Sequence, residues 1–65
     1  MSSYVPLCFD NLSIAQLQNM ERNAISRGDN DVRFRLLRAG KGSETDRKWV
    51  MDVVKNDPTW IEDRI

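Results

Sequence analysis

Residues 12–28 read LSIAQLQNMERNAISRG and contain the signals for both ends of a helix. Ser13 and Gln16 have the spacing of a capping box, in which each side chain bonds to the backbone N–H of the other. Gly28 can take the left-handed conformation that ends many helices. A helix is therefore predicted over 14–27. Its apolar residues recur at the spacing of one helical stripe, and they are Ile14, Leu17, Met20, Ala24 and Ile25.

The segment that follows this helix has a mixed pattern. Asp29 can serve as an N-cap, and Gly40 comes directly after the apolar pattern, so a helix is predicted over 31–39. Residues 32–36 also alternate apolar and basic side chains, which is typical of a strand. The length of the segment and its two terminal signals favour the helix, and the strand is the alternative.

Two more helical segments complete the C-terminal half. Ser43 precedes a predicted helix over 44–56, and Asp57-Pro58 has the order of a cap and a first helical residue for a short helix over 58–64. Residues 4–9, YVPLCF, form an apolar arm in which Pro6 favours extended backbone. We therefore predict one small all-α domain over 1–65, with three to four short helices and an extended N-terminal arm.

The composition argues against catalysis. The 65 residues include no histidine and one cysteine. General acid–base catalysis near neutral pH most often uses histidine, and a catalytic thiol at Cys8 would lack its usual base. Cys8 has no companion for a disulfide within the chain, and the usual zinc ligands are missing. We expect no enzyme, no cofactor, no metal and no small-molecule substrate.

The short length makes association the expected means of stabilisation. A chain of this size buries only about 60% of the surface that it exposes when unfolded, and such a core rarely supplies more than about 3–5 kcal/mol. With neither a disulfide nor a metal, a homodimer is the expected assembly. The apolar residues predicted at the dimer interface lie in the arm and in the last helix, and they are Tyr4, Leu7, Phe9, Trp60 and Ile61.

The distribution of apolar and basic residues predicts a cytoplasmic protein with no membrane partner. No apolar run approaches the roughly 18 residues of a membrane span. Met1-Ser2-Ser3 lacks the basic region of a secretory signal peptide.

The net charge is zero, but the charges are unevenly placed. Residues 22–41 hold six basic side chains against two acidic ones, whereas the segments before and after are acidic on balance. One interpretation is that the ends neutralise the middle within the fold or across a dimer. The other is a basic surface for nucleic acid or an acidic protein. The residues predicted to bind a partner are Arg33, Arg35, Arg38 and Lys41.

Two functions are consistent with these patterns. The first is a non-enzymatic helical regulator or accessory protein, of a bacterial or phage type, that binds a protein partner and acts as a homodimer. The second is a small DNA-binding transcriptional regulator that uses the basic segment 33–41.

The DNA-binding alternative has a parallel in the order of the elements. An extended apolar segment, a helix, a glycine turn and a second capped helix follow one another over 4–39, and this order resembles the ribbon-helix-helix DNA-binding proteins. The resemblance implies a mixed strand-helix-helix dimer whose paired strands enter the major groove. Tyr4, Pro6 and Cys8 would then face the bases.

Overall fold

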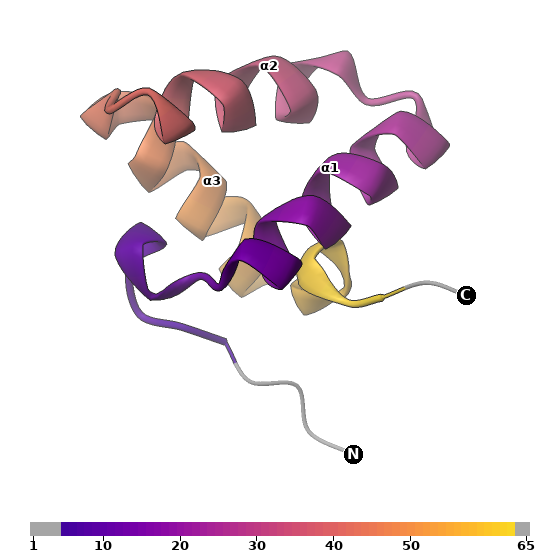
Figure 1. The fold of residues 1–65 in the computed structure, drawn as a ribbon, viewed down its shortest axis with the longest axis horizontal. Helices are drawn as coiled ribbons and strands as arrows, with labels where there is room; N and C mark the ends of the chain where they lie inside the picture. Colours follow the sequence, from indigo (N-terminus) through magenta and orange to yellow (C-terminus); the bar gives the residue numbers. More distant parts are fainter. Residues whose placement is uncertain (1–4, 64–65) are drawn as a thin grey trace.

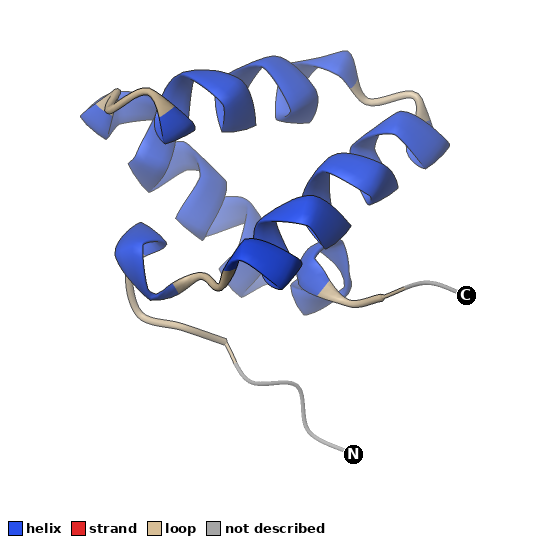
Figure 2. Cartoon of the chain, viewed as in Figure 1, coloured by secondary structure: helices blue, strands red, loops and turns tan. Residues whose placement is uncertain are grey.

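The regular structure of this protein is entirely helical over the residues that can be described. The computed structural model describes residues 5–63. Three α-helices follow one another, α1 (Ile14–Arg27), α2 (Asn30–Gly40) and α3 (Glu44–Asn56), flanked by two 3-10 turns, η1 (Phe9–Asn11) and η2 (Pro58–Ile61). These residues contain no strand (Figure 2). The all-α prediction is confirmed, and both the strand interpretation of 32–36 and the strand-helix-helix alternative are wrong over residues 5–63.

Helix α1 has the bounds and both caps predicted from the sequence. The Gln16 N–H donates to Ser13 Oγ at 3.1 Å, and the Ser13 N–H donates to Gln16 Oε1 at 2.9 Å. Gly28 has a φ of 69°, and its N–H donates to the carbonyls of Ala24 and Ile25. A positive φ is readily adopted by glycine, so the helix ends there.

Helices α2 and α3 also begin at side-chain caps. Asp29 Oδ1 accepts from the Val32 N–H at 3.2 Å, and Ser43 Oγ accepts from the Asp46 N–H at 3.3 Å. Helix α2 is one residue longer at each end than the predicted 31–39. It begins at Asn30, because the Asp29 carbonyl already accepts from the Arg33 N–H. At the other end it includes Gly40. Helix α3 has the predicted bounds.

The last predicted helix, over 58–64, is a single 3-10 turn that ends at Ile61. Asp57 caps it as expected, since Asp57 Oδ1 accepts from the Thr59 N–H at 3.1 Å. The backbone is extended at Glu62, and the side-chain amides of Asn19 and Asn23 on α1 donate to the carbonyls of residues 59–62. Residue 64, the predicted end, lies outside the described residues.

Helix α2 packs against both other helices, and η2 packs against α1 and α3 (Figure 1). The buried apolar residues come from every α-helix and from both flanking segments, and they are Leu12, Met20, Ala24, Val32, Leu36, Ala39, Val50, Met51, Val54, Trp60 and Ile61. The N-terminal arm continues to Cys8, which precedes η1. The turn η1 then packs against α3.

Candidate interaction surface

The apolar stripe predicted on α1 is divided between the core and the surface. Met20 and Ala24 are fully buried and Leu17 is partly buried, but Ile14 is 76% exposed and Ile25 is 57% exposed. The buried side of α1 faces α2 and η2, which are the elements that pack against it. Ile14 and Ile25 are eleven residues apart, which is about three turns, so they share one face of the helix.

Two polar residues lie between these isoleucines on the same face. Gln18 is one turn from Ile14, Glu21 is one turn from Ile25, and both are exposed. We call Ile14, Gln18, Glu21 and Ile25 the outer face of α1. Glu21 makes no ion pair with another residue of 5–63. The outer face therefore has an isoleucine at each end and polar side chains in the middle.

A mostly apolar groove borders this face. It has a volume of about 230 Å³ and lies between α1 and α2. We call it the α1–α2 groove. Exposed Leu37, at 45%, is one of its lining residues, and Phe34, one turn earlier on α2, is 53% exposed. The full lining is Phe9, Ile14, Leu17, Gln18, Glu21, Leu36, Leu37 and Gly40.

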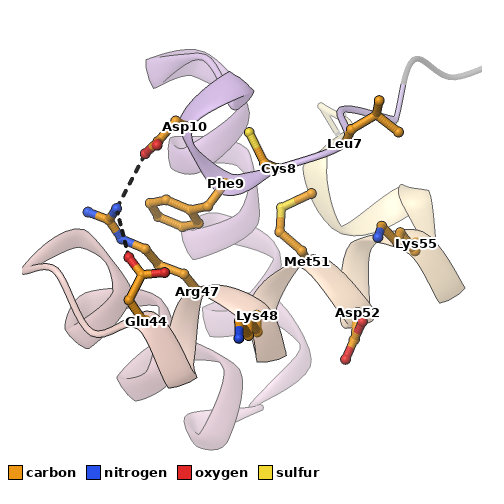
Figure 3. A pocket seen from close by; sticks show the side chains of 10 residues that line it. All are labelled: Leu7, Cys8, Phe9, Asp10, Glu44, Arg47, Lys48, Met51, Asp52 and Lys55. Atoms are coloured by element: carbon orange, nitrogen blue, oxygen red, sulfur yellow. Dashed lines mark hydrogen bonds and ion pairs between the residues drawn. The ribbon is translucent and has the colours of Figure 1, made fainter.

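A second pocket, of about 400 Å³, lies between the N-terminal arm and α3 (Figure 3). Arg47 connects the two elements. Its guanidinium donates to Asp10 Oδ1 at 3.4 Å and to the Ala39 carbonyl at 2.9 Å, and it lies 5.2 Å from the centre of the Phe9 ring. Leu7 points away from α3 and is 83% exposed. Basic and acidic side chains line this pocket together.

The residues predicted at a dimer interface are placed in three different environments. Leu7 is on the surface, and Phe9 is partly buried against the core. Trp60 and Ile61 are buried in the core of the same chain, where the Arg27 guanidinium covers the Trp60 ring at 4.1 Å. Trp60 and Ile61 therefore leave little surface within this chain for the dimer interface that was predicted for them. Tyr4 lies outside the described residues.

The four basic residues predicted to bind a partner are also separated. Arg38 Nε donates to Asp46 Oδ2 at 2.9 Å, and Arg35 Nη1 donates to Asp46 Oδ1 at 3.4 Å. Arg35 also lies 4.7 Å from the centre of the Trp49 ring. Arg33 and Lys41 are exposed and form no ion pair within residues 5–63.

Asp46, in the first turn of α3, is a buried charged residue. The signal in the sequence was the pair Arg35 and Arg38, one turn apart, followed by an acid in the first turn of the next helix. The hydrogen bond from Arg38, with a further contribution from Ser43, lowers the pKa of Asp46 below its ordinary value of 3.8. The Thr59 hydroxyl likewise lowers the pKa of Asp57. Both carboxyls are kept charged near neutral pH.

Two asparagines of α1 hold η2 in place, and neither was among the predicted site residues. Asn23 is buried, and its Nδ2 donates to the carbonyls of Thr59, Trp60 and Glu62 at 3.1, 2.8 and 3.0 Å. Asn19 Nδ2 donates to the Ile61 carbonyl at 3.2 Å. The one signal for them is their spacing of one turn on the side of α1 that carries Met20. We call Asn19 and Asn23 the asparagine clamp.

Two kinds of site are missing from the part of the chain that the structure describes. No group of three histidine, cysteine, aspartate or glutamate side chains is placed to hold a metal ion. No helix there has both the length and the hydropathy to cross a bilayer.

Comparison with models of protein families finds no match to this chain, and comparisons with curated proteins and with solved structures find none either.

Proposed function

We propose that this protein is a non-catalytic interaction module that holds a protein partner through the outer face of α1 and the adjoining α1–α2 groove. The observation that carries the proposal is the exposure of Ile14 and Ile25 on one helix face, beside an apolar groove. Exposed large apolar side chains beside an apolar groove are typical of an interaction site on a small domain. A helix face next to a groove is a common means of binding another helix.

The chemistry of the carboxyls supports a role in binding over one in catalysis. A general acid near neutral pH needs a carboxyl whose pKa is raised. The pKa values of Asp46 and Asp57 are instead lowered by hydrogen-bond donors. Both are engaged with arginines of other elements, since Asp46 pairs with Arg35 and Arg38 and Asp57 pairs with Arg27. These contacts join the elements of the fold.

The DNA-binding alternative has less support than the sequence alone suggested. Non-specific binding to a duplex depends on several cationic side chains that contact phosphates. Asp46 is paired with two of the four predicted ones, Arg35 and Arg38. Arg33 and Lys41 remain unpaired within residues 5–63, and we propose that they form part of a polar rim beside the α1–α2 groove. Fluorescence anisotropy with a mixed-sequence duplex at two salt concentrations tests the alternative directly, since affinity that falls steeply with salt would favour it.

Site-specific photocrosslinking tests the proposed function. A photoreactive phenylalanine analogue replaces Phe34 or Leu37 in one set of variants and exposed Lys48 on α3 in the control. We expect discrete adducts with a protein from the first set, identified by mass spectrometry, and none from the control position. Ile14→Asp in the same chain should abolish those adducts, because it places a charge on the binding surface.

Two results would contradict the proposal. One is the same adducts from Lys48 as from Phe34 and Leu37, which indicates contact without a preferred surface. The other is adducts that persist in the Ile14→Asp background.

A further inference from the structure

We infer that the outer face of α1 binds a second copy of this chain, with the two α1 helices packed antiparallel across a twofold axis. The inference rests on the proposed function and names the occupant of the proposed surface. A twofold dimer uses the same patch on both copies, so the patch has to be complementary to itself.

The outer face of α1 meets that requirement through its spacing. Ile14 and Gln18 are four residues apart, Gln18 and Glu21 are three apart, and Glu21 and Ile25 are four apart. The intervals are the same in either direction along the helix. An antiparallel copy therefore places its Ile25 opposite Ile14 and its Glu21 opposite Gln18, and the symmetry repeats both pairs.

Charge complementarity favours this antiparallel arrangement over a parallel one. Glu21 is the only charged member of the outer face, and a parallel pair would put two Glu21 carboxylates opposite each other. The antiparallel pair puts each carboxylate against a Gln18 amide, which can donate a hydrogen bond to it. The ion pairs within residues 5–63 leave Glu21 available, since none of them includes it.

The α1–α2 groove provides a seat for the isoleucine of the second copy. Gln18 and Glu21 line the groove together with Ile14, so it borders the outer face from its middle to its N-terminal end at Ile14. Gly40 also lines it, and there is open space within 4 Å of where a Gly40 side chain would begin. The Ile25 side chain of the second copy comes to this end of α1, and the symmetry fills both grooves.

The size of the face predicts a weak dimer. Eleven residues of helix span about 16 Å, and a helix with its side chains is about 10–12 Å wide. A face of these dimensions covers about 200 Å² on each copy, which is well below the roughly 800 Å² per partner of a standard interface. We expect dissociation in the micromolar range or weaker.

Sedimentation equilibrium on the full chain, from about 10 μM to 1 mM, tests the inference. Ile14→Asp and Ile25→Lys are suitable single variants, because an acid at the start of a helix and a base near its end both suit the helix dipole. Each should weaken the dimer at least about tenfold, since it removes an isoleucine from both halves of the interface. Leu7→Asp is the matched control, because Leu7 is the most exposed large apolar residue of the described chain and lies off this face.

The double variant Ile14→Asp/Ile25→Lys tests the antiparallel register itself. In that register each new aspartate faces the new lysine of the second copy, so dimerisation should recover relative to both single variants and become sensitive to salt. Within one chain the two positions are about 16 Å apart, beyond the screening length at physiological salt, so their attraction in the monomer is small. Circular dichroism confirms that each variant remains helical.

Three outcomes would overturn the inference. They are a monomer at every concentration, a dimer that Leu7→Asp disrupts and Ile14→Asp does not, and a double variant no better than the single ones. A monomer would leave the proposed function standing if Phe34 and Leu37 still crosslink to a different protein. Failure of both experiments would remove both proposals.

Discussion

Helices α1 and α3 have nearly the same length and the same kind of serine cap, yet their apolar residues are covered to different extents. On α3, Val50 and Val54 are fully buried, and Trp49 and Val53 pack against the core. On α1, Ile14 and Ile25 are exposed. The difference follows from the neighbours, because among the elements of residues 5–63 α3 packs against α2, η1 and η2, whereas α1 packs against α2 and η2. An apolar stripe thus indicates that a helix has a contact face, and the number of packed neighbours determines how much of it is covered.

The largest difference in stability is expected between variants on the buried and on the exposed side of α1. Met20→Ala should lower the free energy of unfolding by about 2–5 kcal/mol, because a fully buried side chain leaves a cavity. Ile14→Ala, on the exposed side, should change it by less than about 0.5 kcal/mol in the monomer. Urea denaturation at low protein concentration measures both. Equal losses for the two variants would mean that α1 does not have one covered side and one open side.

A smaller effect is expected from the asparagine clamp, which covers the inner side of α1 with η2. Asn23→Ala should cost about 1–3 kcal/mol, because it removes a hydrogen-bond donor from the buried Trp60 carbonyl and from the partly buried carbonyls of Thr59 and Glu62. Trp60 fluorescence should shift toward that of a solvated indole before global unfolding. Asn30→Ala, on the exposed side of α2, is the control. A wild-type denaturation curve for Asn23→Ala would show that the Asn23 hydrogen bonds are not needed to hold η2.

The smallest effect at neutral pH is expected from Asp46, which joins α3 to α2. Because its pKa is lowered in the folded chain, its contribution to stability is present above the ordinary value of 3.8 and is lost as the pH falls through the lowered pKa. The wild type should therefore lose stability below about pH 4 more steeply than Asp46→Asn. Thermal unfolding between pH 2 and pH 7 measures the two slopes. The pKa of Asp57 is also lowered, so the stability of the Asp46→Asn variant should still fall with falling pH, but less steeply. Parallel slopes for the two proteins would contradict this account.

Local signals in the sequence were sufficient for the main elements of the fold. The capping box at Ser13 and the glycine stop at Gly28 predicted α1 to the residue, and Ser43 predicted the start of α3. These signals succeed because a cap satisfies helix-end backbone groups within a few residues of chain. The same reasoning overestimated the last helix, over 58–64, because its carbonyls bond to Asn19 and Asn23, more than 30 residues away.

The candidate surface was only partly visible in the sequence. The stripe of α1 contained Ile14 and Ile25, but nothing local distinguishes them from Met20 and Ala24, which share the apolar pattern. The basic cluster was found, whereas its pairing with Asp46 was not, since that contact depends on how α2 and α3 meet. Trp60 and Ile61 were assigned to a dimer interface, because nothing in the sequence around them indicates that Asn19 and Asn23 bond to their carbonyls.

The amino-acid sequence by itself determined the bounds of α1 and α3, the bounds of α2 to within one residue, and which residues are apolar enough to be covered. These properties depend on hydrogen bonds and side-chain spacing within one or two turns. The packing of the helices decided which apolar residues are covered, which arginines are neutralised and which face of α1 is left open. Those outcomes depend on contacts between residues far apart in the chain, and a local pattern carries no information about them.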